Sequence, residues 1–393
     1  MKYLEKGLEV LKLIEEQGFK AYIIGGSVRD HLLGQVSHDV DICTNASIDD
    51  LSKIFTNITL NGSKYLSVTV NYDCYDFEIT HFRKDISYIN HRHPVVEEVS
   101  DISEDLKRRD FTVNAIAMSK EGNYIDMFDG QTDLENELLR AIGDPNIRFE
   151  EDVLRILRAC YFASKLNFDV EDNTLKGMIA NKKYLCELSN QRLFDLSIKI
   201  IYAKYDKGLK IIRDNNLFEY CPIYKKLFDI ANKAYSLEEL FALYYQKYRE
   251  YPVEFPQMYR NLVIGVDEII SSNFSNYTMY KNQIYFNTAF NVAKVLKINA
   301  NEQVVKFYNL PIKEDSELAV SKYEISKYFS GRNISLAIKD IINDILDYKI
   351  ENNKEAILNK IKELVEKYEE VTECLCWCLQ YNNCITRQIR RSR

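Results

Sequence analysis

The composition and the periodicity of the chain both change near Gly143. Up to and including that residue, the chain holds nine of its thirteen glycines and all five histidines, together with short strand-like runs such as 65–72 and 75–82. Alternating and β-branched residues of this kind are typical of strands. Beyond Gly143 the apolar residues recur at helical spacing over long segments, for example 153–168 and 196–218. The sequence therefore predicts an α+β chain, in which a small α/β head is followed by an all-helical part.

At 393 residues the chain exceeds the usual size of a single hydrophobic core, so two or more domains are expected. No apolar run approaches the roughly 20 residues that cross a bilayer, and the chain begins with an amphipathic, mixed-charge helical pattern. We therefore expect a soluble, cytoplasmic protein with no membrane partner. The formal net charge of −7 argues against a surface coated with positive charge, but it allows a local basic groove for nucleic acid.

Residues 21–24 form an apolar run that ends in a double glycine. A buried strand is expected here, and Gly25 and Gly26 allow the backbone to turn tightly after it. The N–H groups of such a turn and of a following helix can face a phosphate, and Arg29 would lie on the first helical turn. The spacing is neither that of a Walker loop nor that of a dinucleotide G-x-G-x-x-G site. By itself this feature predicts only a turn.

Two aspartates, Asp39 and Asp41, are separated by a single valine. Side chains at i and i+2 of a strand point to the same face, so the two carboxylates are expected to project together. They repel one another unless a cation lies between them. Mg²⁺ prefers oxygen ligands and keeps positions open for phosphates, which suits nucleotidyl transfer. The alternative is an exposed strand end with two solvated acids.

A third carboxylate would strengthen the metal hypothesis. Glu78 lies in alternating register within the strand-like run 75–82, and Asp126 is a second candidate. We prefer Glu78, because it lies inside the next strongly strand-like segment. The predicted catalytic residues are therefore Asp39, Asp41 and Glu78, of which the two aspartates bind the metal.

The segment 105–118 carries three consecutive basic residues directly before an apolar stretch. Arg108 or Arg109 could hold triphosphate oxygens bidentately. Asp110 and Asn114 could hold a ribose hydroxyl or the local backbone. A solvated charge run is the alternative interpretation of the basic residues.

A helix is predicted over 150–166, with Asp152 and Arg155 on one face and Arg158 adjoining it. A pair at this spacing is most often a modest surface ion pair. The functional alternative is recognition of a base. An Asp accepts from the exocyclic amine of cytosine or adenine, and an Arg donates to the neighbouring ring acceptors, so the pair could exclude guanine and uracil.

Seven motifs follow one another in the order GGSVRD, DVD, FEITHFR, NHRHP, DLKRRDFTVNAIA, DMFDG and EEDVLRILRA. This set resembles the class II CCA-adding tRNA nucleotidyltransferases, relatives of bacterial poly(A) polymerase within the polymerase β-like superfamily. The resemblance implies a nucleotidyltransferase head with about five strands, then a helical neck, body and tail. We place these parts at 1–140, 141–200, 201–290 and 291–393, with the nucleotide-recognition helix in the neck and tRNA bound by the tail.

The resemblance also implies roles for single residues. Asp39 and Asp41 would bind Mg²⁺, and Asp152 with Arg155 would act as an amino-acid template for CTP and ATP. Together with the reasoning above, the predicted nucleotide-binding residues are Gly25, Gly26, Arg29, Arg109, Asp110, Asn114, Asp152, Arg155 and Arg158. The family pattern R-A-x-R-F is broken, because Tyr161 replaces the second arginine, so the role of that arginine is not transferred.

The stretch HFRKDISYINHRHP at 81–94 is similar to the flexible loop of CCA-adding enzymes, and bacterial poly(A) polymerases usually lack its R-H-P pattern. We therefore expect an enzyme that adds C, C and A to the tRNA 3′ end from CTP and ATP with Mg²⁺. Partial CC- or A-addition and poly(A) synthesis are the alternatives. A noncatalytic RNA-binding protein is disfavoured because both aspartates are present, and a nucleotidyltransferase of small molecules would leave the helical half unexplained.

Overall fold

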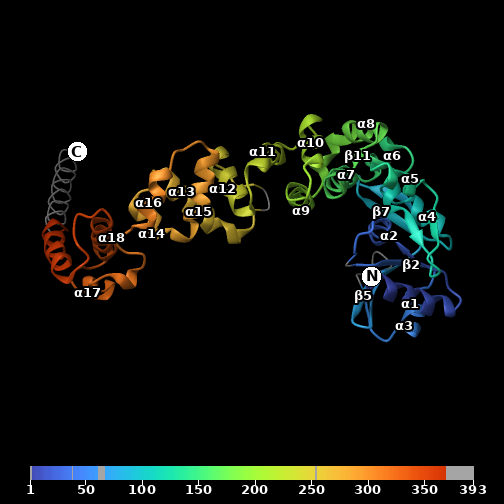
Figure 1. Ribbon diagram of the computed structural model, residues 1–393, viewed down its shortest axis with the longest axis horizontal. Coiled ribbons are helices and arrows are strands. Elements are labelled where there is room, and N and C mark those ends of the chain that lie inside the picture. Colours follow the sequence, from blue (N-terminus) through green and yellow to red (C-terminus); the bar gives the residue numbers. More distant parts are fainter. Residues whose placement is uncertain (1, 38, 61–66, 253–254, 369–393) are drawn as a thin grey trace, which may run out of the picture. The chain divides into compact units, whose positions relative to one another are not determined.

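The computed structural model describes residues 2–37, 39–60, 67–252 and 255–368 (Figure 1). These residues form two compact units. The first comprises the chain up to Asn232 together with Pro252, and the second comprises 233–251 and 255–368. No helix in the described part of the chain is long and apolar enough to cross a membrane. The division into head, neck, body and tail stays a prediction, and the last part of its tail lies outside the described residues.

A seven-stranded mixed sheet lies at the centre of the first unit, with the strand order β3-β4-β5-β2-β1-β8-β9. Its strands are β1 Ala21–Ile24, β2 Asp41–Thr44, β3 Ile58–Leu60, β4 Ser67–Tyr72, β5 Tyr75–His81, β8 Ile116–Met118 and β9 Tyr124–Asp126. Among the described pairs of this sheet, only β2 and β5 run in parallel. The sheet is wider than the resemblance implied, because two short strands, β3 and β9, extend its edges.

Several helices pack against the sheet, and the apolar residues on their inner faces are buried there. These helices are α1 Lys2–Glu16, α2 Gly26–Leu32, α3 Ile48–Ile54, α4 Ile102–Lys107 and α5 Gly130–Glu135, with the 3₁₀ turn η1 Thr112–Asn114. Val10, Leu11 and Ile14 of α1 are buried at helical spacing. Gly7 permits close packing, because a Cβ atom there would lie 3.0 Å from Val40 and 3.1 Å from Ile23. The amphipathic helix expected at the start of the chain is confirmed.

A separate two-stranded hairpin follows β5 directly. Its strands are β6 Arg83–Ile89 and β7 His93–Glu98, which pair in antiparallel register with a shift between Asp85 and Ser87. Asn90 and His91 at the turn have φ values of 52° and 51°, a conformation in which the short polar side chain of asparagine is tolerated. The hairpin corresponds to the segment that resembles a flexible loop.

Helices follow in the rest of the first unit. They are α6 Pro145–Glu151, α7 Leu154–Leu166, α8 Asp172–Asn181, α9 Asn190–Ile201, α10 Lys207–Asp214 and α11 Pro222–Ile230, with the 3₁₀ segment η2 Lys182–Glu187. α6 begins at Pro145, and the Asp144 side chain accepts a hydrogen bond from the N–H of Asn146 at its start. One departure from all-helical structure is the short strand β11 Asp169–Val170, which pairs with β10 Leu138–Leu139.

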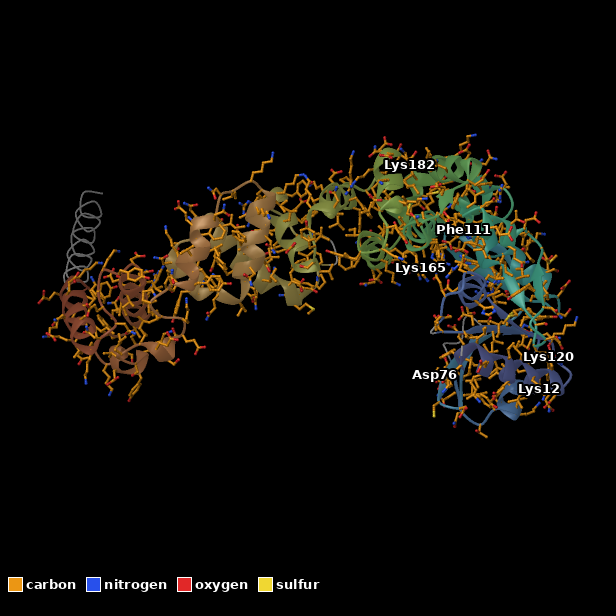
Figure 2. All side chains as sticks on the ribbon, in the orientation of Figure 1. Lys12, Asp76, Phe111, Lys120, Lys165 and Lys182 are labelled. Atoms are coloured by element: carbon orange, nitrogen blue, oxygen red, sulfur yellow. The ribbon has the colours of Figure 1, made fainter. Side chains whose placement is uncertain are left out.

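The predicted single helix over 150–166 is wrong, because the chain leaves helical geometry at Asp152. Its backbone is extended, with φ −140° and ψ 96°, between the end of α6 and the start of α7. Its carboxylate accepts the N–H of Leu154 at 3.1 Å, which satisfies a backbone donor at the start of α7. α7 also contacts the sheet region, because Nζ of Lys165 lies 3.8 Å from Oδ2 of Asp30 on α2. Figure 2 labels Lys165.

The described residues of the second unit form helices joined by loops, with no strand. Its helices are α12 Leu237–Tyr248, α13 Arg260–Ser271, α14 Asn276–Lys281, α15 Phe286–Val295, α16 Asn301–Tyr308, α17 Lys322–Ser326 and α18 Arg332–Leu346, followed by helical residues at 354–368. α12, α13 and α15 contact one another and bury Phe241, Val266 and Phe286. Within α13 and α15 the buried residues recur at helical spacing, as the sequence predicted.

Candidate active site

β1 and α2 are joined at Gly25, whose φ of 71° is a conformation that favours glycine. A Cβ atom at this position would lie 3.2 Å from Nη1 of Arg109 and 3.9 Å from Oδ2 of Asp41. The turn therefore brings a backbone segment, a carboxylate and a guanidinium to one place. The tight turn after the strand 21–24 is confirmed, and its role in holding a phosphate stays a prediction.

The register of the sheet brings two of the predicted carboxylates, Asp41 and Glu78, to paired positions on neighbouring strands. Asp41, the first residue of β2, pairs with Ile24 of β1 on one side and with Glu78 of β5 on the other. The expectation that Asp39 lies in this strand is wrong, because β2 begins only at Asp41. β1 ends at Ile24, opposite Asp41, and the chain turns away at Gly25. Hydrogen-bonded pairing between β1 and β2 therefore stops at Asp41. Asp39, Asp41 and Glu78 are all exposed.

Although part of Asp41 is exposed, the protein atoms packed around its carboxylate desolvate it, and this is the main reason why its pKa is raised to about 6. Arg109 opposes the rise, whereas the negative charges of Glu78 and Asp39 add to it. Among the described residues, no group of three or more Asp, Glu, His or Cys side chains is placed to hold a metal ion by itself. The oxygen donors of Asp39 and Asp41 fit Mg²⁺, which commonly takes one or two carboxylates and completes its shell with water and phosphate oxygens.

Asp126, the alternative third carboxylate, has a structural role. Its side chain accepts hydrogen bonds from the backbone N–H groups of Gly130 at 2.9 Å and of Gln131 at 2.8 Å, at the start of α5. These bonds satisfy donors at the N-terminal end of that helix. The structure therefore favours Glu78, the residue beside Asp41, as the third carboxylate of the site.

A buried ion cluster lies beside the glycine turn. Asp105 of α4 is fully buried, and its Oδ1 accepts from Nε and Nη2 of Arg108 at 3.0 and 2.7 Å. Its Oδ2 accepts from Nη2 of Arg109 at 3.1 Å. The basic segment 107–109 is therefore not a solvated charge run at Arg108 and Arg109, whose side chains are each only 16% exposed.

Arg29 lies beneath the site and contacts three different segments. Its Nη1 donates to Oδ1 of Asn114 at 2.6 Å, and its Nε and Nη2 donate to Oδ1 of Asp30 at 2.8 and 2.6 Å. The guanidinium also lies 5.2 Å from the ring centroid of Phe162 on α7. Arg29 is only 2% exposed and all three of its guanidinium nitrogens donate hydrogen bonds, and its contact with a nucleotide stays a prediction.

Asn114 and Asp110 continue this network toward α7. Nδ2 of Asn114 and Nε of Arg158 donate to the carboxylate of Asp110 at 3.1 and 2.6 Å. Although desolvation opposes the shift, the charge of Arg158 and the hydrogen bond from Asn114 lower the pKa of Asp110. The structure thus brings the predicted residues Arg29, Asp110, Asn114 and Arg158 together, and the side chain of Arg158 is 41% exposed. Their contacts with a nucleotide stay predictions.

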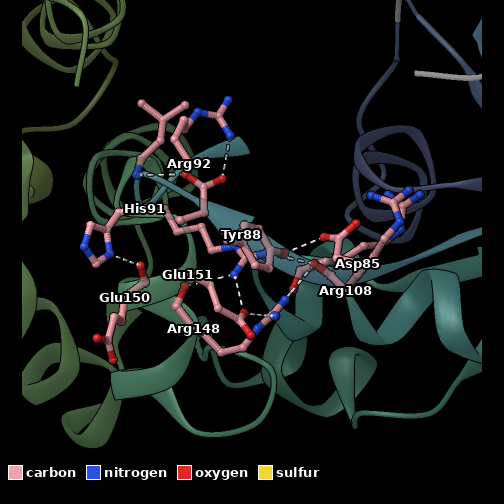
Figure 3. A network of polar contacts seen from close by, with 12 residues as sticks. Asp85, Tyr88, His91, Arg92, Arg108, Arg148, Glu150 and Glu151 are labelled. Atoms are coloured by element: carbon pink, nitrogen blue, oxygen red, sulfur yellow. Dashed lines mark hydrogen bonds and ion pairs between the residues drawn. The ribbon is translucent and has the colours of Figure 1, made fainter. Parts of the chain in front are cut away.

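Asp152 and Arg155 do not form with each other the surface ion pair that their spacing most often gives. The carboxylate of Asp152 accepts from Nη1 of Arg92, in the turn of the hairpin, at 2.7 Å (Figure 3). Desolvation raises the pKa of Asp152, and the positive charges of Arg92 and Arg155 oppose this. The Asp152 side chain is 12% exposed.

Arg155 is buried among acceptors from three segments. Its Nη2 donates to the hydroxyl of Tyr88 at 3.1 Å and to the carbonyl of Arg108 at 3.0 Å, and its Nη1 donates to the carbonyl of Arg148 at 2.9 Å (Figure 3). The hairpin is held further by His91, whose carbonyl accepts the N–H of Val153 at 3.1 Å. Both members of the predicted base-reading pair therefore contact the hairpin β6–β7.

Comparisons with known proteins identify the family. Residues 21–140 match the Poly A polymerase head domain family. The CCA-adding enzyme of Ligilactobacillus salivarius is 32% identical over 392 residues, which cover 92% of this chain and 97% of that protein. The CCA-adding enzyme of Lactobacillus gasseri is 35% identical over 377 residues, covering 89% and 95%. This chain belongs to the CCA-adding enzymes.

Solved structures agree with this assignment. The crystal structure of the Bacillus stearothermophilus CCA-adding enzyme in complex with CTP has a TM-score of 0.75 and 26% identity, covering 94% of this chain and 99% of that chain. The Thermotoga maritima CCA-adding enzyme complexed with tRNA shares the fold, with a TM-score of 0.64 and 20% identity. The resemblance to CCA-adding tRNA nucleotidyltransferases and the α+β fold with a helical C-terminal region are confirmed.

The structure of this CCA-adding enzyme places two further side chains in the site. The carboxylate of Asp105 binds two arginines, and Nη2 of Arg148 donates to the carbonyls of Arg108 and Arg109 at 2.6 and 2.9 Å. Arg108 and Arg109 follow Asp105 by three and four residues, and this helical spacing could have predicted the ion pairs of Asp105. Nothing in the local sequence indicates the contacts of Arg148, because the carbonyls that accept its hydrogen bonds lie about 40 residues earlier in the chain.

Tyr161 stands where the CCA-adding enzymes usually have a second arginine. It is half-buried, and its ring centroid lies 5.4 Å from that of Phe162. The same Phe162 ring lies 5.1 Å from the guanidinium carbon of Arg158. Tyr161 thus packs against Phe162, the ring that Arg29 and Arg158 also contact, and adds no positive charge.

Proposed function

We propose that this protein adds C, C and A in turn to the 3′ end of tRNA, using CTP and ATP and releasing pyrophosphate. One observation carries the proposal. Arg155 donates to the carbonyl of Arg108, and the side chain of the next residue, Arg109, faces Gly25 and Asp41. A guanidinium suited to the edges of cytosine and adenine is thereby attached to the segment that presents a cation beside the proposed phosphate site.

The proposed reaction joins the 3′ hydroxyl of tRNA to the α-phosphorus of the nucleotide. A bond forms between the 3′ oxygen and the α-phosphorus, and the bond from the α-phosphorus to the bridging oxygen breaks. Pyrophosphate leaves with that oxygen, and the hydroxyl proton passes to solvent water. Asp39 and Asp41 would hold Mg²⁺, which supplies charge neutralisation for the phosphates and makes the attacking hydroxyl more acidic. Arg109 would bind the triphosphate through Nη1, and Gly25 would let the phosphates approach the backbone. Glu78 adds negative charge beside Asp41 and so favours a bound cation.

The base would be selected by Asp152 and Arg155. Cytosine and adenine present an exocyclic amine that an Asp can accept, beside a ring nitrogen that can accept from an Arg. Uracil and guanine present a carbonyl oxygen where the amine would be. For the pair to read a base, the carboxylate of Asp152 must exchange Arg92 for the amine, and Arg155 must release one acceptor such as Tyr88. We therefore propose that the hairpin shifts when a nucleotide binds.

The remaining assignments extend the same proposal. Arg29, Asp110, Asn114 and Arg158 would support the ribose and phosphates, with Arg158 the most accessible of them. The parts 1–140, 141–200, 201–290 and 291–393 would serve as head, neck, body and tRNA-binding tail. A cytoplasmic location would supply CTP, ATP and tRNA together.

The test uses purified protein and tRNAs that end before C, after C and after CC. Each tRNA is incubated with each nucleotide separately and then with CTP and ATP together, and the products are resolved by length. The proposal expects completion of CCA and no further extension. Addition of C alone or A alone would indicate a partial enzyme, and long tails from ATP would indicate poly(A) synthesis.

A further inference from the structure

Asp105 is a buried carboxylate to which none of the steps above assigns a task. It lies on α4 and is fully buried, yet it accepts two bonds from Arg108, one from Arg109, and the backbone N–H of Arg83 at 3.4 Å. Although desolvation opposes the shift, the charges of Arg109 and Arg108 lower its pKa, so it is ionised. A buried ion cluster contributes little net stability, because the cost of desolvation offsets the attraction. Stability alone therefore gives a weak reason for this arrangement.

The direction of the Arg109 side chain gives a stronger reason for burying Asp105 beside it. Asp105 binds Nη2, whereas the other terminal nitrogen, Nη1, lies on the side of Gly25 and Asp41. Nε of Arg109 is buried and forms no hydrogen bond among the described residues. The only hydrogen bond that orients the guanidinium there is thus the one to Asp105.

We propose that Asp105 is a positioning residue, which holds Nη2 of Arg109 so that Nη1 points at the place of the nucleotide's phosphates. The inference rests on the proposed function, because it takes the space above Gly25 as the phosphate site. Asp105 also offsets one of two adjacent positive charges, so that Arg108 and Arg109 can lie side by side. Without it the two guanidinium groups repel each other, and Arg109 loses its anchor.

The phosphates are common to all nucleotides, so the effect of Asp105 should not depend on the base. Asp105→Asn keeps the shape of the side chain but removes its charge. Loss of this charge-assisted anchor should raise the Kd for CTP and for ATP by a common factor of roughly ten or more. Exclusion of UTP and GTP should be unchanged. Binding is measured without tRNA, so the readout does not depend on turnover.

Asp133→Asn is the matched control. Asp133 is also a buried carboxylate paired with an arginine, since it accepts from Nε of Arg140 at 3.1 Å and from the hydroxyl of Thr112 at 2.6 Å. It should lower the melting temperature and leave nucleotide binding unchanged. Equal binding defects in the two variants, or wild-type binding by Asp105→Asn, would overturn the positioning role.

Two further measurements close the remaining gaps. Arg109→Lys, alone and combined with Asp105→Asn, completes a double-mutant cycle. The two binding defects should be strongly non-additive if Asp105 acts through Arg109. Additive defects would contradict the proposal.

If Asp105→Asn does not fold, Asp105→Glu decides, because it keeps the charge but displaces the carboxylate. Weakened binding of both nucleotides supports positioning, and unchanged binding refutes it. Wild-type protein that adds no C or A to tRNA would instead disprove the proposed function.

Discussion

Asp152→Asn is the substitution that tests base selection most directly. The two side chains have nearly the same shape, but asparagine replaces one acceptor oxygen by an N–H donor. The variant can still accept from the amine of cytosine or adenine. After rotation of the amide it can also donate to the carbonyl oxygen that uracil or guanine presents at that place. Selectivity against UTP and GTP should therefore fall, while some correct addition remains.

The contacts in the structure set the expected size of two separate effects. A good base contact is worth about 1–3 kcal/mol of discrimination, so selectivity should fall by roughly five- to 150-fold. The substitution also removes the negative charge that Asp152 presents to Arg92 in the folded state; the two side chains are 12% and 26% exposed. The hydrogen bond to Arg92 and the one from the N–H of Leu154 can persist with a neutral acceptor. We therefore expect a destabilisation of only about 1 kcal/mol.

The assay is incorporation of each of the four nucleotides onto tRNA ending before each position, together with a thermal melt. Arg92→Gln is the control, because it breaks the same ion pair but leaves the Asp152 carboxylate in place. It should lose similar stability and still exclude UTP and GTP. Unchanged selectivity in Asp152→Asn, or equally relaxed selectivity in Arg92→Gln, would refute base reading by this carboxylate.

The other predictions concern the metal site, the hairpin and the glycine turn. Asp39→Ala or Asp41→Ala should abolish addition of both C and A with little change in melting temperature, because each removes one of several repelling carboxylates; near-normal addition by either variant would disprove the assignment. Shortening the hairpin 83–98 should impair A addition more than C addition, and equal loss of both would indicate a purely structural segment. Gly25→Ala should destabilise the fold by about 1–2 kcal/mol because of its positive φ, measured by urea unfolding, and should weaken CTP binding because its Cβ would lie against Arg109.

The parts of the fold that depend on local sequence were predictable. The strand 21–24 and the turn at Gly25 follow from an apolar run and a double glycine, whose effects reach only a few residues. The change from mixed to helical structure near Gly143 follows from periodicity in the same way. Asp39 was placed wrongly in a strand because the end of β2 is set by its partner β1, which no local pattern encodes.

The base-reading pair could not be derived correctly from its spacing, because its partners come from far along the chain. Asp152 binds Arg92, 60 residues earlier, and Arg155 binds Tyr88, 67 residues earlier. These hairpin groups offer what a base would offer, namely N–H donors to the carboxylate and an acceptor to the guanidinium. Both side chains need such partners, since a buried polar group without one costs about 1–3 kcal/mol. A matching base would thus exchange bonds at little net cost, whereas uracil or guanine would leave Asp152 facing a carbonyl, so that selectivity would arise from the bond a wrong base cannot replace.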